Sequence, residues 1–342
     1  MRRVASLSLA AVSLAALTLL ASHAAAAPPS PPAAAKGPRI PVILDTDIGD
    51  DIDDTWALAL LLRSPELDLK LVVTDYGDTL FRARLTAKLL EAAKRTDVPV
   101  GVGVRQWAKD GAQAEWLGDY ALARYPGRVF EDGVQALIDT VMRAPAPITL
   151  IAIGPPPTLH AALEREPRIA AKLRLVGMYG SLREGYAPRS KPEPEWNVRA
   201  EPKAARALLQ APWRDALLTP LDTCGHVVLD GARFARLRAS QDPLVQAVLE
   251  NYRLWCPRAE WCARDNQSDT RSSTLFDTVA VYLAFAHDLV AVERLGVRVS
   301  DDGMTVADPA APPLVWATSW KNLDGFRDLL TDRLLDGTGL AR

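Results

Sequence analysis

The chain has 342 residues, of which 49% are hydrophobic, 24% charged and 6% aromatic, and its formal net charge is -2. This length and apolar content suffice for a large hydrophobic core, and they exclude a disordered chain, a collagen and a disulfide-dense miniprotein. The near-neutral charge, without a long basic run, argues against a nucleic-acid binder that depends on phosphate neutralisation.

The N-terminus has the features of a secretory signal peptide. A short basic segment precedes an apolar run over residues 4–20, and small residues then offer an Ala-x-Ala cleavage site. We therefore predict a signal peptide over residues 1–26, a Pro/Ala-rich spacer over 27–38 and one domain over 39–342. An uncleaved anchor helix is the alternative, and the shortness of the apolar run disfavours it. The sequence predicts a periplasmic or secreted protein with no membrane association after signal cleavage.

From residue 39 onward, short β-branched runs alternate with longer helical segments. Strands are expected at residues 40–44, 69–73, 98–102, 148–153, 173–178, 295–299 and 314–317. Helices are expected at residues 54–63, 79–95, 132–143, 159–164, 201–210, 231–254, 275–286 and 322–335. Continuous apolar strands between helices indicate a parallel sheet covered on both faces. The predicted fold class is α/β, a single domain with a largely parallel, Rossmann-like central sheet flanked by helices.

The most informative segment is the acidic stretch 45–54, which reads DTDIGDDIDD. It holds six carboxylates in ten residues and no lysine or arginine. It follows an apolar strand and leads into a helix, so it lies at the carboxyl end of a strand, where open α/β sheets bind ligands. A solvated acidic loop and helix capping are the other interpretations, but capping accounts for only one or two of the acids.

A packed acidic cluster needs compensating positive charge. Two carboxylates about 5 Å apart repel by on the order of 3 kcal/mol at an effective dielectric constant of about 20. Protons or a cation can offset this repulsion, and an all-oxygen cluster suits Ca²⁺ or Mg²⁺. An EF-hand loop fits poorly, because Gly49 falls at its fifth position and Asp50 at its sixth. The stretch therefore predicts a site for a hard divalent cation.

Three cysteines, Cys224, Cys256 and Cys262, remain in the predicted mature chain. An oxidising compartment allows one disulfide, and Cys256 and Cys262 are the closer pair. Spacing alone leaves this bridge open. Without a matching histidine cluster the cysteines do not predict a zinc site.

The stretch DTDIGDDIDDTWAL resembles the N-terminal signature of the nucleoside hydrolases, the inosine–uridine N-ribohydrolase group. Three later segments resemble family segments in the same order: 148–155 (ITLIAIGP), 195–205 (EWN followed by EPKAA) and 276–280 (FDTVA). The resemblance covers roughly residues 39–335. It implies the nucleoside hydrolase fold and the cleavage of ribonucleosides to free base and ribose.

The resemblance also implies a metal centre. Asp47, Asp54 and Asp277 are expected to be carboxylate ligands of one Ca²⁺ per subunit, together with the backbone carbonyl of Ile153. Asp47 is also expected to act as the general base for the metal-bound water. Asp45 is expected to support these ligands from behind.

A second set of residues is expected to bind the sugar. The resemblance implies that Asp53, Glu195 and Asn197 hold ribose hydroxyls. Asp78 stands where the family often has a substrate-contacting asparagine, and it can still accept from a ribose hydroxyl. Without the resemblance, the proline-rich segment before Glu195 would indicate an exposed loop.

Further departures from the family pattern leave the base preference open. Phe276 replaces a histidine that assists the leaving base in some members, so we expect another acid or activation by stacking alone. Tyr186 or Arg189 is expected to line the pocket in place of the usual sugar-binding asparagine. His226 is the histidine that we place nearest the site.

The favoured hypothesis is a secreted or periplasmic, Ca²⁺-dependent nucleoside hydrolase with an oxocarbenium-like transition state. Its partner is a small-molecule nucleoside rather than a nucleic acid, and a homo-oligomer is left open. One alternative is a metal-dependent DxD phosphatase with Asp45 as nucleophile and Asp47 as acid and base. Another is a non-catalytic nucleoside- or sugar-binding protein of the same fold, which the altered residues Asp78 and Phe276 motivate.

Overall fold

The computed structural model describes residues 38–109, 111–264 and 267–336. The predicted signal peptide and all but the last residue of the predicted spacer lie outside these residues. In the part of the chain that is described, no helix combines the length and the apolar character needed to span a membrane.

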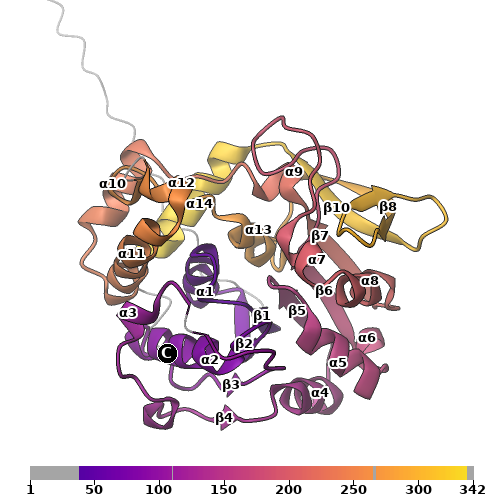
Figure 1. Cartoon of the computed structure of the whole chain (residues 1–342), viewed down its shortest axis with the longest axis horizontal. Coiled ribbons are helices and arrows are strands. Elements are labelled where there is room, and N and C mark those ends of the chain that lie inside the picture. Colours follow the sequence, from indigo (N-terminus) through magenta and orange to yellow (C-terminus); the bar gives the residue numbers. More distant parts are fainter. Residues whose placement is uncertain (1–37, 110, 265–266, 337–342) are drawn as a thin grey trace, which may run out of the picture. The chain divides into compact units, whose positions relative to one another are not determined.

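Ten strands of the described residues form one sheet in the order β4-β3-β2-β1-β5-β6-β7-β10-β8-β9 (Figure 1). The strands are β1 (Ile40–Thr46), β2 (Leu67–Thr74), β3 (Val100–Gly101), β4 (Val129–Phe130), β5 (Ile148–Ala152), β6 (Leu173–Met178), β7 (Asp215–Thr219), β8 (Val290–Val299), β9 (Thr305–Ala307) and β10 (Pro313–Trp320). Pairing is parallel from β4 across to β10, whereas β8 is antiparallel to both β10 and β9. The predicted, largely parallel α/β sheet is confirmed.

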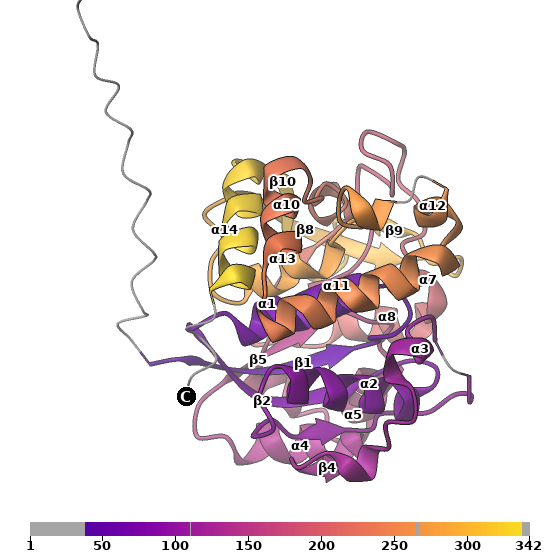
Figure 2. The same cartoon turned by 90° about the vertical axis from the view of Figure 1, so that its left-hand side faces the viewer.

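Helices cover both faces of this sheet (Figure 1). They are α1 (Asp53–Leu62), α2 (Thr79–Ala92), α3 (Ala114–Leu117), α4 (Gly133–Arg143), α5 (Pro157–Arg165), α6 (Ile169–Lys172), α7 (Trp196–Ala200), α8 (Pro202–Gln210), α9 (Leu221–Cys224), α10 (Gly231–Ala239), α11 (Pro243–Trp255), α12 (Glu260–Ala263), α13 (Phe276–Leu283) and α14 (Leu323–Leu335). Helices α10, α11 and α14 gather beside α1, and α10 packs on both α11 and α14 (Figure 2).

Strand β1 lies inside the sheet, between β2 and β5. This position accounts for the apolar run at residues 42–44. Val42 and Leu44 belong to the hydrophobic cluster on one face, whereas Ile43 belongs to the cluster on the other. Leu44 pairs with β2 on one side and with β5 on the other. A parallel strand buried on both faces favours apolar side chains toward either face, as at Val42, Ile43 and Leu44, and the polar residues Asp45 and Thr46 come only at its carboxyl end.

Two local predictions were wrong. The helix predicted over 231–254 is two helices, α10 and α11, because the Asp242 carboxylate caps the first turn of α11 and Pro243 occupies that turn. The strand predicted over 98–102 is reduced to Val100–Gly101. Strand β7 (Asp215–Thr219) was not predicted.

The strand order reverses at β1, and this reversal positions the site. The chain leaves β1 toward β2, β3 and β4 and later returns to β5 on the other side of β1. The loops that follow β1 and β5 therefore diverge and leave a crevice at the carboxyl ends of the two strands. The Ile153 amide, which follows β5, donates to the carbonyl of Asp45 in β1 at 3.0 Å.

Candidate active site

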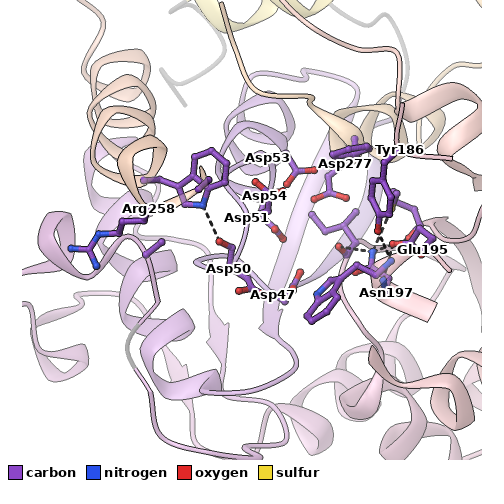
Figure 3. A pocket seen from close by; sticks show the side chains of 17 residues that line it. Asp47, Asp50, Asp51, Asp53, Asp54, Tyr186, Glu195, Asn197, Arg258 and Asp277 are labelled. Carbon is purple, nitrogen blue, oxygen red and sulfur yellow. Dashed lines mark hydrogen bonds between the residues drawn. The ribbon is translucent and has the colours of Figure 1, made fainter. Parts of the chain in front are cut away.

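A pocket of about 440 Å³ opens at this crevice (Figure 3). Its lining residues are Asp47, Asp50, Asp51, Asp53, Asp54, Ala112, Ile153, Met178, Tyr186, Glu195, Trp196, Asn197, Trp255, Arg258, Ala259, Phe276 and Asp277. Acids of the 47–54 loop lie on one side, and Tyr186, Glu195 and Asn197 lie across from them (Figure 3).

Three buried carboxylates converge in this pocket. Asp53 and Asp54 begin α1, and Asp277 lies in the first turn of α13, which packs against α1. Each offers one carboxylate oxygen, and these oxygens lie within 4.8 Å of one another. The Asp277 amide donates to Asp53 Oδ2 at 3.3 Å, and the Thr46 hydroxyl donates to the Asp54 carboxylate. Two segments far apart in sequence thus form one cluster of carboxylates.

The electrostatics of this group favour a bound cation. Burial, and then repulsion by neighbouring carboxylates, raises the pKa of Asp53, Asp54 and Asp277 well above the ordinary range. Within residues 38–109, 111–264 and 267–336, no lysine or arginine forms an ion pair with any of the three. A divalent cation would remove the repulsion, and oxygen donors suit Ca²⁺ or Mg²⁺. The residues present therefore fit a hard cation.

Asp47 follows β1 and lines the same pocket, but it lies outside the three convergent carboxylates. Gly154 packs against it so closely that a Cβ there would lie 2.9 Å from both the Asp47 amide nitrogen and Oδ1. Burial raises the pKa of Asp47 to about 8, although the Arg82 guanidinium acts in the opposite direction. A carboxylate whose pKa is raised is a stronger base than an ordinary one, so ionised Asp47 is suited to accept a proton.

Glu195 and Asn197 form the opposite wall. Glu195 caps α7 by accepting the Asn197 amide at 2.7 Å, and it also accepts the Gly180 amide at 2.9 Å. Burial raises the pKa of Glu195 to about 7 despite these bonds. The Asn197 side-chain amide donates to the carbonyls of Ile153 (3.2 Å) and Met178 (3.0 Å). The NH₂ group of Asn197 thus donates to backbone carbonyls. Its amide oxygen is the atom that could accept a hydrogen bond from a ligand.

Asp45 lies beneath the pocket rather than in it. It is fully buried, and the carboxyl group beside it is that of Asp75. Burial and the neighbouring Asp75 raise the pKa of Asp45 well above its usual range. The phosphatase alternative requires Asp45 to attack a substrate, and the residue is absent from the lining of the pocket.

Asp78 is the predicted substrate contact that the structure does not bring to the pocket. Its carboxylate caps α2 by accepting the Phe81 amide at 3.2 Å and pairs with Arg105 through two bonds of 2.9 and 3.0 Å. It lines a neighbouring hollow instead. A carboxylate placed just before a helix is captured by the free N–H groups of the first turn, and here that interaction holds it away from the other acids.

Of the two residues expected in place of the usual asparagine, Tyr186 lines the pocket and Arg189 does not. The Tyr186 hydroxyl accepts the Trp196 amide at 2.7 Å, and its ring meets Phe276 edge-on with centroids 6.0 Å apart. His226 is outside the lining residues and hydrogen-bonds Glu184 at 2.8 Å.

Several lining residues were not predicted. Asp50 and Asp51 face the pocket beyond the expected acids, and Trp255 donates its indole N–H to the Asp50 carbonyl at 3.0 Å. Arg258 also lines the pocket, although its guanidinium points away from the acids (Figure 3). The Cys256–Cys262 disulfide, which spacing left open, is formed and encloses Arg258. In the sequence, Trp255 directly before Cys256 was the available sign that this segment lines the pocket.

Comparisons with known proteins show which family this chain resembles. The sequence profile described as inosine-uridine preferring nucleoside hydrolase matches residues 42–330. The pyrimidine-specific ribonucleoside hydrolase RihA of Salmonella arizonae is 28% identical over 319 residues, which cover 86% of this chain and 98% of that protein. The non-specific ribonucleoside hydrolase RihC of Escherichia fergusonii is 33% identical over 202 residues, 56% of this chain and 64% of that protein.

Solved structures show the same fold. A plant nucleoside hydrolase, PpNRh1, superposes with a TM-score of 0.73 at 24% identity and covers 87% of this chain and all 100% of its own. A purine-preferring ribonucleoside hydrolase from Gardnerella vaginalis gives a TM-score of 0.70 at 20% identity, covering 88% of this chain and 100% of its own.

Proposed function

The chain belongs to the inosine-uridine preferring nucleoside hydrolase family, whose enzymes are N-glycosyl hydrolases, and we propose that it cleaves ribonucleosides in a Ca²⁺-dependent reaction. The observation that carries this proposal is the convergence of Asp53, Asp54 and Asp277 beside Asp47 at the sheet crevice. The names of similar proteins range from pyrimidine-specific and non-specific to purine-preferring, so the proposed substrate class is ribonucleosides in general.

We assign Asp54 and Asp277 as the principal ligands, because they belong both to the set expected from sequence and to the convergent carboxylates. Asp47 and Ile153 line the same pocket, and we assign the Asp47 carboxylate and the Ile153 carbonyl to complete the set. Asp53 already accepts the Asp277 amide, and we assign its carboxylate to a sugar hydroxyl. Oxygen ligands of this kind suit Ca²⁺.

The chemistry then follows from the placement of the chain's own groups. Asp47, Asp54, Asp277 and the Ile153 carbonyl would hold the Ca²⁺, which when bound would lower the pKa of the attacking water. Asp47 accepts the proton of that water. Glu195 and Asn197 hold the sugar across the pocket, which fixes the direction of attack. The surrounding carboxylates stabilise the positive charge that develops on the sugar in the oxocarbenium-like transition state.

We further propose that the protein acts in the periplasm or outside the cell. The N-terminal sequence supports export. The Cys256–Cys262 disulfide supports it as well, because such bonds persist mainly in oxidising compartments.

A chromatographic assay of the purified mature protein tests this function. The protein is incubated with inosine, uridine, adenosine, guanosine or cytidine, once with Ca²⁺ and once with excess chelator. We expect free base and ribose, and we expect chelation to abolish their release. Binding of a nucleoside without any product, in a folded protein that holds metal, would instead support the non-catalytic alternative.

A further inference from the structure

Arg82 is a buried arginine in the first turn of α2, directly behind the carboxylate pocket. Only 6% of the residue is exposed. Its guanidinium donates to the backbone carbonyls of Asp47 and Ile48, the latter at 3.1 Å, and its Nε donates to the carbonyl of Tyr76 at 2.7 Å. One side chain therefore joins the loop that follows β1 to the loop that follows β2.

The charge of Arg82 is balanced without a direct ion pair. Among the described residues no carboxylate lies within ion-pair distance of its guanidinium, which instead donates to the carbonyls of Asp47, Ile48 and Tyr76. A buried cation is costly unless nearby charge compensates it. Here the acidic cluster compensates at a distance, while the N–H groups bind carbonyls. The carboxylates of the cluster consequently form no ion pair with Arg82.

Arg82 bonds to the backbone at Tyr76, which has an unfavourable conformation. Tyr76 has a φ of 57°, which is unfavourable for a residue with a bulky side chain. Such a conformation persists only where surrounding bonds enforce it. Besides the bond from Arg82 to its carbonyl, Tyr76 donates its amide to the Asp75 carboxylate at 2.7 Å.

The backbone conformation at Tyr76 places its ring against two tryptophans. We call the rings of Tyr76, Trp107 and Trp196 the aromatic wall. The Tyr76 ring meets Trp107 edge-on at 5.1 Å and Trp196 at 6.1 Å. The three rings line a hollow of about 460 Å³, and this hollow shares Asp50, Trp196 and Arg258 with the carboxylate pocket.

We propose that Arg82 is a positioning residue that fixes Asp47 and the aromatic wall relative to each other through their backbone carbonyls. It touches no reacting atom itself. It sets how far the proton-accepting carboxylate lies from the wall. The kinetic part of this inference rests on the proposed function, whereas the metal-binding part does not.

Three variants test it, measured as full-length mature proteins: Arg82→Lys, Arg82→Met and, as a matched control, Arg84→Met. Arg84 lies on the same helix, is half-buried and also donates from Nε to a carbonyl, that of Tyr120 at 2.8 Å, but it does not line the carboxylate pocket. The readouts are Tb³⁺ affinity by tryptophan-sensitised luminescence, Ca²⁺ affinity by competition with Tb³⁺, thermal unfolding with chelator, and kcat and KM for the best nucleoside.

We expect both Arg82 variants to lose metal affinity by about tenfold or more and to lose kcat more than they raise KM. Lysine keeps the charge but lacks the planar fork that reaches several carbonyls at once, so charge alone should not rescue it. Arg84→Met should keep wild-type metal affinity and kinetics. An Arg82→Lys protein that unfolds at the same temperature as Arg84→Met shows that the losses are not general destabilisation.

Two results would overturn the proposal. One is wild-type metal affinity and kinetics in both Arg82 variants. The other is tighter metal binding by Arg82→Met with wild-type behaviour of Arg82→Lys, because that pattern means Arg82 acts through its charge alone. If Arg82→Met does not fold, Arg82→Lys decides. If the wild-type protein cleaves no nucleoside, the proposed function fails while the metal affinities still decide the role of Arg82.

Discussion

The pocket has two ends that differ in structure, which we call the carboxylate end and the loop end. The carboxylate end stands on β1, β5 and two packed helices, and Asp54 and Asp277 are only 2% and 3% exposed. The loop end, where the pocket meets the neighbouring hollow, is formed by the aromatic side chains Trp107 and Trp196, which are 44% and 39% exposed. A rigid scaffold is needed where several like charges must converge. Loops suffice where a surface has to fit a variable part of the substrate.

The largest effect should come from the carboxylate end. Asp277→Asn keeps the size of the side chain but removes one charge from the convergent group, so we expect loss of Ca²⁺ binding and a fall in kcat/KM of about 10³-fold or more. Calorimetric Ca²⁺ titration and steady-state kinetics measure the two losses. Asp50→Asn is the matched control, because Asp50 is the exposed acid of the same segment, and it should cost less than about tenfold. Full activity in Asp277→Asn would remove this residue from the site.

A pair of neighbouring substitutions sharpens the division within the carboxylate end. We expect Asp54→Asn to lower Ca²⁺ affinity by about 10- to 100-fold, because Asp54 is assigned as a ligand. Asp53→Asn should keep most of that Ca²⁺ affinity. Its effect should instead be a higher KM and a lower kcat for a ribonucleoside. Parallel metal titrations and kinetics of the two variants make the comparison. Equal metal loss in both would assign Asp53 to the cation rather than to the sugar.

The burial of these acids also predicts how stability depends on pH when metal is removed. Burial raises the pKa of Asp47 to about 8 and that of Glu195 to about 7, whereas unfolded carboxyl groups titrate near pH 4. Between about pH 4 and about pH 8 the folded, metal-free chain therefore binds more protons than the unfolded chain, and its free energy of unfolding falls as pH rises.

We expect the Tm of the chelated protein to fall by about 5 °C or more between about pH 5 and about pH 8. Saturating Ca²⁺ should flatten this dependence, because the cation takes over the role of the protons. Scanning calorimetry with and without chelator provides the measurement. A Tm that rises over this range without metal would contradict the description of the carboxylate end as a buried, self-repelling cluster.

The carboxylate end is also the part that sequence reasoning reached. Asp47 directly follows an apolar strand and Asp54 begins a helix, so their place at the edge of the sheet follows from local patterns. Asp277 lies far away in the chain, and only the resemblance of its segment to a family pattern linked it to the other two. The alternation of strands and helices predicted the parallel sheet for the same reason, since its signals are local.

The loop end could not be reached in this way. Asp78 was expected at the substrate, but its carboxylate is taken by the α2 N-terminus and by Arg105, a partner that only the path of the loop makes available. Trp255 and Arg258 reach the pocket because α11 ends there, and no periodicity encodes that meeting. Exposed side chains carry no burial pattern, so a tryptophan that lines a pocket looks the same in sequence as one on an open surface.

Two such tryptophans provide the mildest test of the comparison. Trp107 and Trp261 are equally exposed, at 44%, but only Trp107 belongs to the aromatic wall, where its ring packs on Tyr76. We expect Trp107→Ala to raise KM by about three- to tenfold, the size of one lost aromatic contact, with little change in kcat and none in Ca²⁺ affinity. Trp261→Ala, measured in the same kinetic and metal titrations, should change neither. If both variants behave alike, the loop end contributes no more to substrate binding than any exposed surface. If Trp107→Ala lowers Ca²⁺ affinity instead, the two ends are coupled more tightly than their separate construction suggests.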